Sequence, residues 1–522
     1  MKILFFAEPF PVRGRPLDFQ WVVGLWLSLS QGLSQLGATP LFAVSEAIKA
    51  ARPDAAPWLL SPADFGVHPV LPQEPGQLDA EWVRLMTDPD MPVWRPFIEA
   101  LLERTRPDAV VTWTVNAPLR AATAARGIVL MNQELGPMRP PNPLLYFADP
   151  QGVNGGSSLP EVWPVVREQP LTREQERELK WLYTEGMAPS PLRREELSRR
   201  LGLVPGRRVL AVFLQVPRDS NILTWSRLRS AEALLELVTE ATSPERHQVL
   251  VKPHPFHPVH PRVEARHVQA VPDVPTESLL EVADAVLTIN SSVGLEALAR
   301  GKVVYSFGEG PYTGRGCTRD LGPEPEQLRK ALAELPFTLT EEEERLRHRL
   351  LHFLVFRYLL PEGELSSPHA LLGRLERWGR LRERGAPRVE WFAPEPAGAR
   401  LALLQAEKVA AEARAQLTAT TEALRATQAQ ADSLHQQLTA TTQALGESRA
   451  QADSLRQQLT ATTQALGESQ AQADSLRQRL VTTVGELERL RASVGFKVLG
   501  LTRRIPGLYP GYLRAKRLLE RH

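Results

Sequence analysis

Residues 285–302 read A-V-L-T-I-N-S-S-V-G-L-E-A-L-A-R-G-K, and this stretch decides the predicted fold. The run 285–289 predicts a buried strand, and 293–300 predicts a helix. Ser291 or Ser292 can cap that helix. Because the first N–H groups of a helix are free and carry a positive end charge, this junction predicts an anion site suited to a nucleotide phosphate. A plain helix cap is the alternative.

Strands and helices alternate on both sides of this stretch. The second half of the folded region has predicted strands at 207–214, 248–251, 268–271 and 303–307, with helices at 230–239 and 277–283. The first half has predicted strands at 2–7, 39–44, 109–114 and 127–131, with helices at 18–36 and 94–104. Such alternation is typical of parallel sheets covered on both faces. We therefore expect an α/β protein with two Rossmann-like, doubly wound domains that face each other across a cleft, where ligands bind beyond the strand ends.

The domain boundaries follow from composition. Residues 135–165 are rich in Pro, Gly and Asn and show no period, so no regular element is expected there. The predicted organisation is a first domain at 1–165, a helical linker at 166–200, a second domain at 201–335, a helical extension packing back on both domains at 336–398, a coiled coil at 399–494 and a basic tail at 495–522.

The coiled coil is predicted from a repeat. A unit close to L-T-A-T-T-Q-A-L-G-E-S-Q-A-Q-A-D-S-L-R-Q-Q starts at Leu417, Leu438 and Leu459, a spacing of three heptads. Apolar residues then return every 3.5 positions, which indicates a left-handed coiled coil that joins copies of the chain. Thr, Ser and Ala within the seam weaken it, and a solvated spacer helix is the alternative.

Composition excludes several classes. The chain has 522 residues, 43% of them hydrophobic, so it is not globally disordered, and a net charge of +2 disfavours a dedicated nucleic-acid binder. Its single cysteine, Cys317, excludes an internal disulfide framework. With no recognisable signal segment, a cytoplasmic location is expected. Basic and aromatic residues alternate in the tail, which favours contact with an anionic membrane surface, whereas RNA contact or a solvated tail are the alternatives.

A histidine-rich stretch follows one predicted strand. Residues 250–262 read L-V-K-P-H-P-F-H-P-V-H-P-R, so Lys252 and His254 should lie at the carboxyl end of a strand. A cationic Lys beside an anion site, with a His able to donate a proton to a departing phosphate, predicts a phosphate clamp. His254, His257 and His260 recur every three residues, so zinc is an alternative, although no Cys or carboxylate completes a typical ligand set.

Carboxylates are expected on both walls of the cleft. Gln215 ends a strand of the second half, and the following loop presents Asp219. Glu134 follows a strand of the first half within 132–136, N-Q-E-L-G. Facing carboxylates can serve as base and nucleophile in group transfer, and turn or cap roles are the alternatives.

Together these pieces resemble the capsule polysaccharide biosynthesis family, whose studied members are transferases of 3-deoxy-manno-octulosonic acid (Kdo) with the two-Rossmann GT-B fold. The resemblance spans about residues 130–320 in consistent order. It rests on the segments 134–140 with 152–160, 214–222, 252–255, and 288–302 with 316–318.

The resemblance implies a CMP-activated sugar donor, an acceptor-side first domain and a donor-side second domain, with no metal and no other cofactor. It implies that Lys252, His254, Ser291 and Ser292 surround the cytidylate phosphate, and we expect Gln215 and Glu296 to complete the nucleotide site. Glu134 would be the acid/base, and Asp219 the nucleophile of a retaining mechanism. Departures at Gln215-Val216-Pro217 and at Gln133-Glu134-Leu135-Gly136 leave the sugar and the stereochemical course open.

The resemblance thus predicts a glycosyltransferase of capsular or cell-surface polysaccharide at the inner face of the plasma membrane. Its partners would be a nucleotide sugar and a glycolipid or polysaccharide acceptor, and no nucleic acid. The rival hypotheses are a GT-B transferase that uses a UDP-sugar or CDP-glycerol, and an inactive scaffold that works through its coiled coil.

Overall fold

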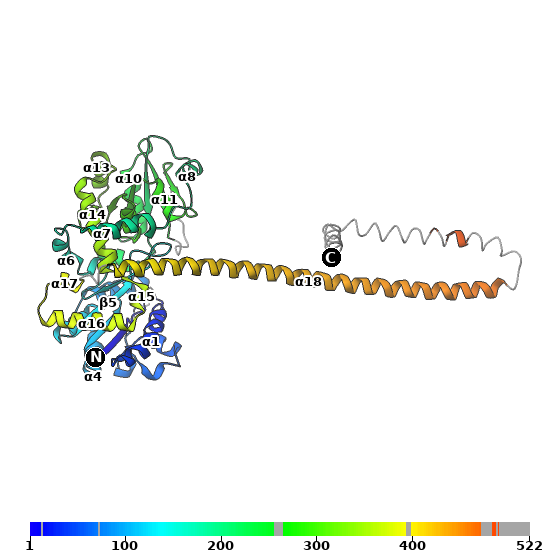
Figure 1. The fold of residues 1–522 in the computed structure, drawn as a ribbon, viewed down its shortest axis with the longest axis horizontal. Coiled ribbons are helices and arrows are strands. Elements are labelled where there is room, and N and C mark those ends of the chain that lie inside the picture. Colours follow the sequence, from blue (N-terminus) through cyan, green and yellow to red (C-terminus); the bar gives the residue numbers. More distant parts are fainter. Residues whose placement is uncertain are drawn as a thin grey trace. The chain divides into compact units, whose positions relative to one another are not determined.

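The computed structural model describes residues 1–11, 14–70, 72, 74–254, 265–392, 398–470, 483–486 and 489. Within these ranges the chain forms two largely parallel sheets, each surrounded by helices, and one helix of 72 residues, α18 (Ala399–Gln470; Figure 1). Both sheets lie in one compact unit, Met1–Arg414, and the second unit is Ala415–His522. The predicted α/β class with two doubly wound halves and a long C-terminal helix is confirmed, whereas the coiled-coil pairing of that helix stays a prediction.

The first sheet has the strand order β13-β6-β5-β4-β1-β2-β3. Its strands are β1 (Lys2–Ala7), β2 (Thr39–Ala43), β3 (Leu59–Leu60), β4 (Ala109–Trp113), β5 (Val129–Leu135), β6 (Leu145–Asp149) and β13 (Leu360–Pro361). The first five are parallel, and β6 and β13 each run antiparallel to the strand beside them. In β1 and β4 almost every residue is buried, whichever way it points, so both faces of the sheet are covered.

The helices of this half are α1 (Gln20–Gln35), α2 (Glu46–Ala51), η2 (Ala56–Trp58), η3 (Pro62–Phe65), α3 (Pro75–Thr87), α4 (Arg95–Thr105), α5 (Ala117–Ala125), η4 (Asn154–Gly156) and α6 (Leu159–Val166). The connection to the second half consists of α7 (Arg173–Trp181), η5 (Leu182–Gly186) and α8 (Arg194–Arg200). The predicted linker is therefore helical but broken into separate pieces.

The second sheet is parallel throughout, with the order β12-β11-β10-β7-β8-β9. Its strands are β7 (Arg208–Phe213), β8 (His247–Lys252), β9 (Val268–Ala270), β10 (Ala285–Thr288), β11 (Val303–Ser306) and β12 (Arg319–Asp320). Its helices are α9 (Ser220–Trp225), α10 (Ala231–Ala241), α11 (Thr276–Val282), α12 (Val293–Ala299) and α13 (Pro325–Glu334). β7 and β10 are neighbours, but the strand that follows β7 lies toward one edge of the sheet and the strand that follows β10 lies toward the other edge. A crevice opens at such a switch point.

Two sequence predictions in the first half are wrong. The region 135–165, expected to lack regular elements, contains β6 and α6. β6 is buried along its whole length, so it has no apolar–polar alternation to reveal it. β5 also continues through Asn132-Gln133-Glu134 instead of ending before them, because these residues pair with β6 in register Asn132↔Asp149 and Glu134↔Phe147.

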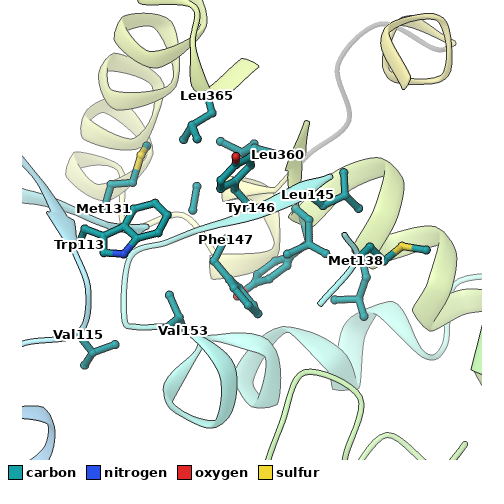
Figure 2. Packing of buried hydrophobic residues seen from close by; sticks show 14 of the residues in the cluster. Trp113, Val115, Met131, Met138, Leu145, Tyr146, Phe147, Val153, Leu360 and Leu365 are labelled. Carbon is teal, nitrogen blue, oxygen red and sulfur yellow. The ribbon is translucent and has the colours of Figure 1, made fainter. Parts of the chain in front are cut away.

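The segment after β12 returns to the first half. It contains α14 (Glu341–Phe353), η6 (Leu354–Tyr358), β13, α15 (Glu362–Leu365), α16 (Pro368–Glu383) and α17 (Arg388–Trp391). Figure 2 shows Leu360 of β13 beside Tyr146 of β6, its partner in the strand register, and the ring of Trp113 lies 6.4 Å from that of Tyr146. On the other side, Arg347 Nη1 donates to the Leu298 carbonyl of the second half (2.8 Å). The segment therefore packs on both halves.

The start of α18 is part of the folded unit. Leu404 is buried, and the Arg400 guanidinium pairs with Glu364 (2.6 Å). Beyond Arg414 the leucines of the repeat are 44–68% exposed; they are Leu417, Leu424, Leu434, Leu438, Leu445, Leu455 and Leu459. In the described part of the chain no helix has an apolar stretch able to cross a bilayer. The predicted tail, 495–522, and residues 471–479 of the repeat that starts at Leu459 lie outside the described residues.

Candidate functional site

Two amide side chains bridge the switch point of the second sheet. Gln215 follows β7 and Asn290 follows β10, and both are buried. Gln215 Nε2 donates to Asn290 Oδ1 (3.0 Å), and the Asn290 backbone N–H donates back to Gln215 Oε1 (3.3 Å). Asn290 Nδ2 donates to the carbonyls of Asn221 (3.1 Å) and Glu309 (3.0 Å). Asn290 thus fixes three loops relative to one another, a role that the sequence analysis did not assign.

A cleft of about 470 Å³ opens above this bridge, and we call it the nucleotide cleft after the ligand predicted from the sequence. Residues of both halves line it. Among the predicted site residues these are Glu134, Gln215, Asp219, Lys252, His254, Ser291 and Ser292. The structure therefore brings together seven residues that lie as far as 158 positions apart in the sequence.

Glu134 lies at the end of β5, on the first-half wall. Its Oε1 accepts a hydrogen bond from the Leu135 N–H (2.9 Å). Burial raises the pKa of the Glu134 carboxyl, the nearby Asp219 carboxylate adds to the rise, and Arg139 partly offsets it. A carboxyl with a raised pKa can exchange a proton nearer to neutral pH than an ordinary glutamate, which suits it to acid/base chemistry.

Asp219 faces Glu134 from the second half, at the N-cap of α9. Its Oδ1 accepts from the Asn221 N–H (2.8 Å), and Gln215 Nε2 donates to Oδ2 (3.4 Å). The loop is tied to the opposite half, since Arg218 donates to both carboxylate oxygens of Asp79 on α3 (2.7 Å each). Asp219 therefore has the cap role considered from the sequence, and it also borders the cleft.

Lys252 ends β8 at the edge of the cleft. Its Nζ donates to the carbonyls of Pro272 and Val274 (2.6 Å each), and burial lowers its pKa. Because an ammonium has three protons, two hold the group in place and one remains for a ligand. His254 lines the cleft close by, whereas His257 and His260 of the zinc hypothesis lie outside the described residues. No cluster of three or more metal-binding side chains occurs among the described residues.

Ser291 and Ser292 form the start of α12. Ser291 Oγ accepts from the Val293 N–H (3.4 Å), and the Tyr312 hydroxyl donates to the Ser291 carbonyl (2.6 Å). Ser292 is at the N-cap but makes no side-chain cap bond, and it lines the cleft. The predicted capping is thus provided by Ser291, and the Ser292 hydroxyl is available to a ligand.

Glu296 does not line the nucleotide cleft. It lies one turn further along α12 and is only 7% exposed. Burial, and then the Glu277 carboxylate, raise its pKa to about 7. Arg139, which does line the cleft, acts electrostatically on Glu296. The structure thus connects Glu296 to the cleft through Arg139, while its predicted nucleotide contact stays a prediction.

Asp149 shapes the loop that follows β6, and the sequence analysis missed it. Its buried carboxylate accepts from the N–H groups of Gln151 (2.7 Å), Gly152 (3.0 Å) and Ser158 (3.0 Å), and from the Tyr358 hydroxyl (2.5 Å). The loop sets its glycines against the second half, because a Cβ at Gly155 or Gly156 would lie 2.7 Å from the Trp225 ring. Only the tertiary structure reveals this role, since an Asp after a strand is common in turns.

Comparison with known proteins gives one family match, which covers the second half, and two partial relatives. Residues 188–341 match the model of the family described as capsule polysaccharide biosynthesis protein. Protein FixF of Sinorhizobium fredii is 29% identical over 243 residues, 44% of this chain and 54% of that protein. Lipopolysaccharide-processing protein LpsZ of Rhizobium meliloti is 35% identical over 140 residues, 25% of this chain and 31% of that protein. The matches thus span about half or less of these relatives.

Among solved structures, the beta Kdo 2,7 transferase of Thermosulfurimonas dismutans KpsC matches with 20% identity and a TM-score of 0.36, covering 53% of this chain and 90% of that chain. The beta Kdo 2,4 transferase of the same KpsC matches with 21% identity and a TM-score of 0.33, covering 46% and 79%. The family match contains β7 to β12 and the second-half residues of the nucleotide cleft. Residues 188–341, which include the second sheet, are therefore the part of this chain that is similar to the capsule polysaccharide biosynthesis protein family.

Proposed function

We propose that this chain is a glycosyltransferase of capsular or other cell-surface polysaccharide that transfers a Kdo-like sugar from a CMP-activated donor. The observation that supports it most is the nucleotide cleft, where Glu134 from one half faces Asp219 and the Lys252, His254 and Ser292 group from the other. The family match and the relatives' printed names agree with this class of activity.

In the proposed reaction the two walls of the nucleotide cleft have different roles. Lys252, His254 and Ser292 would bind the phosphate of the nucleotide and stabilise its charge as the bond to the sugar breaks. Glu134, with its raised pKa, would take the proton of the attacking acceptor hydroxyl. Asp219 would be the nucleophile if the reaction retains configuration and an electrostatic neighbour if it inverts. We expect no metal in either course.

The proposal extends to the rest of the chain. α18 would join copies through its leucine stripe, and the basic tail at 495–522 would hold the enzyme at the inner face of the plasma membrane, near a lipid-linked or polysaccharide acceptor. A UDP-sugar or CDP-glycerol transferase remains the enzymatic alternative, because it would use the same kind of phosphate site.

The test is release of CMP from CMP-Kdo by the full chain, with a UDP-sugar and CDP-glycerol as competing donors. We expect release from CMP-Kdo alone, with a rate about 10²–10⁴-fold lower in Glu134→Gln. Glu422→Gln, an exposed glutamate of α18, is the matched control and should keep the wild-type rate. Release from another donor would contradict the donor assignment. No release from any donor in the presence of a cell-surface glycolipid fraction would favour the scaffold.

A further inference from the structure

A second cleft of about 600 Å³ lies next to the nucleotide cleft, and we call it the Arg315 cleft. The two share walls. The first residues of α9, Ser220 and Asn221, line the nucleotide cleft, whereas Thr224 and Trp225 at its other end line the Arg315 cleft. The two clefts are also adjacent at residues 310–311, where Gly310 lines the Arg315 cleft and Pro311 lines the nucleotide cleft.

Arg315 lies on a tight loop between β11 and β12. The glycines on either side of it, Gly314 and Gly316, have φ angles of +69° and +79°, a left-handed conformation that residues with a side chain rarely adopt. A Cβ at Gly316 would also lie 2.7 Å from Leu346. The loop is therefore built to hold Arg315 in one position, where its side chain lines the cleft and is only 7% exposed.

This guanidinium is almost without partners. Among the described residues its one hydrogen bond is a long one, from Nη1 to the Gly314 carbonyl (3.5 Å), and its buried Nε has none. Burial lowers its pKa, whereas Tyr358 and the carboxylates of Asp320 and Glu309 favour the charged form without a hydrogen bond to it. A buried cation with so few hydrogen-bond partners costs stability, and an anionic ligand in the cleft would offset that cost.

Four other side chains that line the Arg315 cleft already have hydrogen-bond partners. The hydroxyls of Ser226, Ser306 and Thr313 donate to backbone carbonyls. Asp320 accepts from the Gly314 N–H (2.7 Å) and the Thr318 hydroxyl (2.8 Å). Arg315 is thus the group best placed to bind an anionic ligand, with the exposed Arg227 and Arg229 at the rim.

Trp225 gives the Arg315 cleft an aromatic wall. Its ring packs on Gly155 and Gly156, and its buried Nε1 has no partner among the described residues. Aromatic rings bind the apolar C–H faces of sugars, and a planar guanidinium binds carboxylates through two parallel hydrogen bonds. We propose that the Arg315 cleft is a second ligand site, separate from the nucleotide cleft, that binds a saccharide unit bearing a carboxylate. That the ligand is a saccharide rests on the proposed function.

The test is ligand-observed NMR of the full chain with D-glucuronate and free Kdo as acidic probes, D-glucose as the neutral probe and inorganic phosphate as the other anion. The probes are used up to about 10 mM, since a lone sugar unit binds weakly. Each is measured with the nucleotide cleft saturated by CMP. We expect the acidic sugars to bind, glucose and phosphate not to bind, and Arg315→Met to weaken the acidic sugars at least ten-fold while its CMP titration stays that of wild type.

Arg315 is a buried charge with few hydrogen-bond partners in the free protein, so replacing it should not cost stability. Arg315→Met should therefore unfold at a temperature no lower than wild type. If that variant does not fold, Arg315→Lys replaces it and should likewise bind the acidic sugars at least ten-fold more weakly. Binding of phosphate but not of acidic sugars, equal binding of glucose, or acidic-sugar binding unaffected by the Arg315 substitution would each overturn the proposal. A failure to bind CMP would contradict the proposed function instead, so the two failures are distinguishable.

Discussion

At the scale of single residues, Glu134 is the group on which the proposed chemistry depends most. Burial raises its pKa above that of an ordinary glutamate, so it stays protonated to a higher pH. As a base it must be deprotonated, and the rate should therefore fall as the pH drops through this raised value. A pH profile of kcat/KM should show that acidic limb in wild type and lose it in Glu134→Gln. An unchanged profile in the variant would remove Glu134 from the reaction.

Glu296 makes a prediction about stability. Its pKa of about 7 in the folded protein exceeds the ordinary 4.5, so the folded state binds this proton more tightly than the unfolded state. Stability should consequently decrease as the pH rises from 4.5 toward 7, by about 3 kcal/mol at most from this group. Urea unfolding at pH 5 and pH 8 should show a smaller decrease in Glu296→Gln than in wild type. Glu8, with a similar shift, is present in both proteins and cancels from the difference.

The sequence could predict where polar side chains meet but not how they bond. Residues that end neighbouring parallel strands share one edge of the sheet, which is why Gln215, Lys252 and Ser291 were found together. Asn290, Asp149 and Arg315 were missed because their importance depends on partners, or on missing partners, far away in the sequence. Glu296 was expected in the nucleotide site because it follows Ser291 and Ser292 in the same motif; it does not line the cleft, and its contact with a nucleotide stays a prediction.

At the scale of elements, the contact between η4 and α9 should be sensitive to a single methyl group. Gly156→Ala would place a Cβ 2.7 Å from the Trp225 ring, and relieving that overlap should destabilise the fold by about 1–3 kcal/mol. It should also displace Asp219, at the other end of α9, and lower activity. The matched control is Gly373→Ala within α16, where nothing lies within 4 Å, and it should stabilise by about 0.5–1 kcal/mol. Equal effects in denaturant unfolding would contradict this account of the contact.

Helices and strands whose apolar residues recur with a clear period were predicted to within a few residues. Elements without such a period were missed or misplaced. The strand predicted at 2–7 is β1, and the helix predicted at 94–104 is α4 (Arg95–Thr105). The helical extension predicted at 336–398 is instead interrupted by β13, because a two-residue strand has no period of its own and forms only by pairing with β6. In the same way, pairing with β6 extends β5 beyond its apolar run.

At the scale of the whole molecule, the leucine stripe of α18 predicts association between copies. Sedimentation equilibrium of the full chain should give a mass above that of the monomer. Leu424→Asp with Leu445→Asp places charges in the seam and should yield a monomer. Ala429→Asp with Ala450→Asp adds the same charge at positions away from the seam and should leave the assembly intact. A monomeric wild type would instead indicate a solvated spacer helix.

The two α/β halves and the long helix could be predicted because each repeats a simple pattern many times. The boundary of the folded unit was harder to predict from the sequence. α18 begins at Ala399, but its first turns pack on the folded unit, which ends at Arg414. Arg400 and Leu404 belong to that packing, and their contacts depend on partners such as Glu364.

The central claim is that the nucleotide cleft binds a cytidine monophosphate donor. Calorimetric titration of the full chain with CMP, CDP, UDP and GDP tests it most directly. The account predicts selective binding of CMP, at least ten-fold weaker in His254→Ala and unchanged in His435→Ala, whose histidine lies on the exposed part of α18. A preference for UDP or CDP, or no binding of any nucleotide, would contradict it.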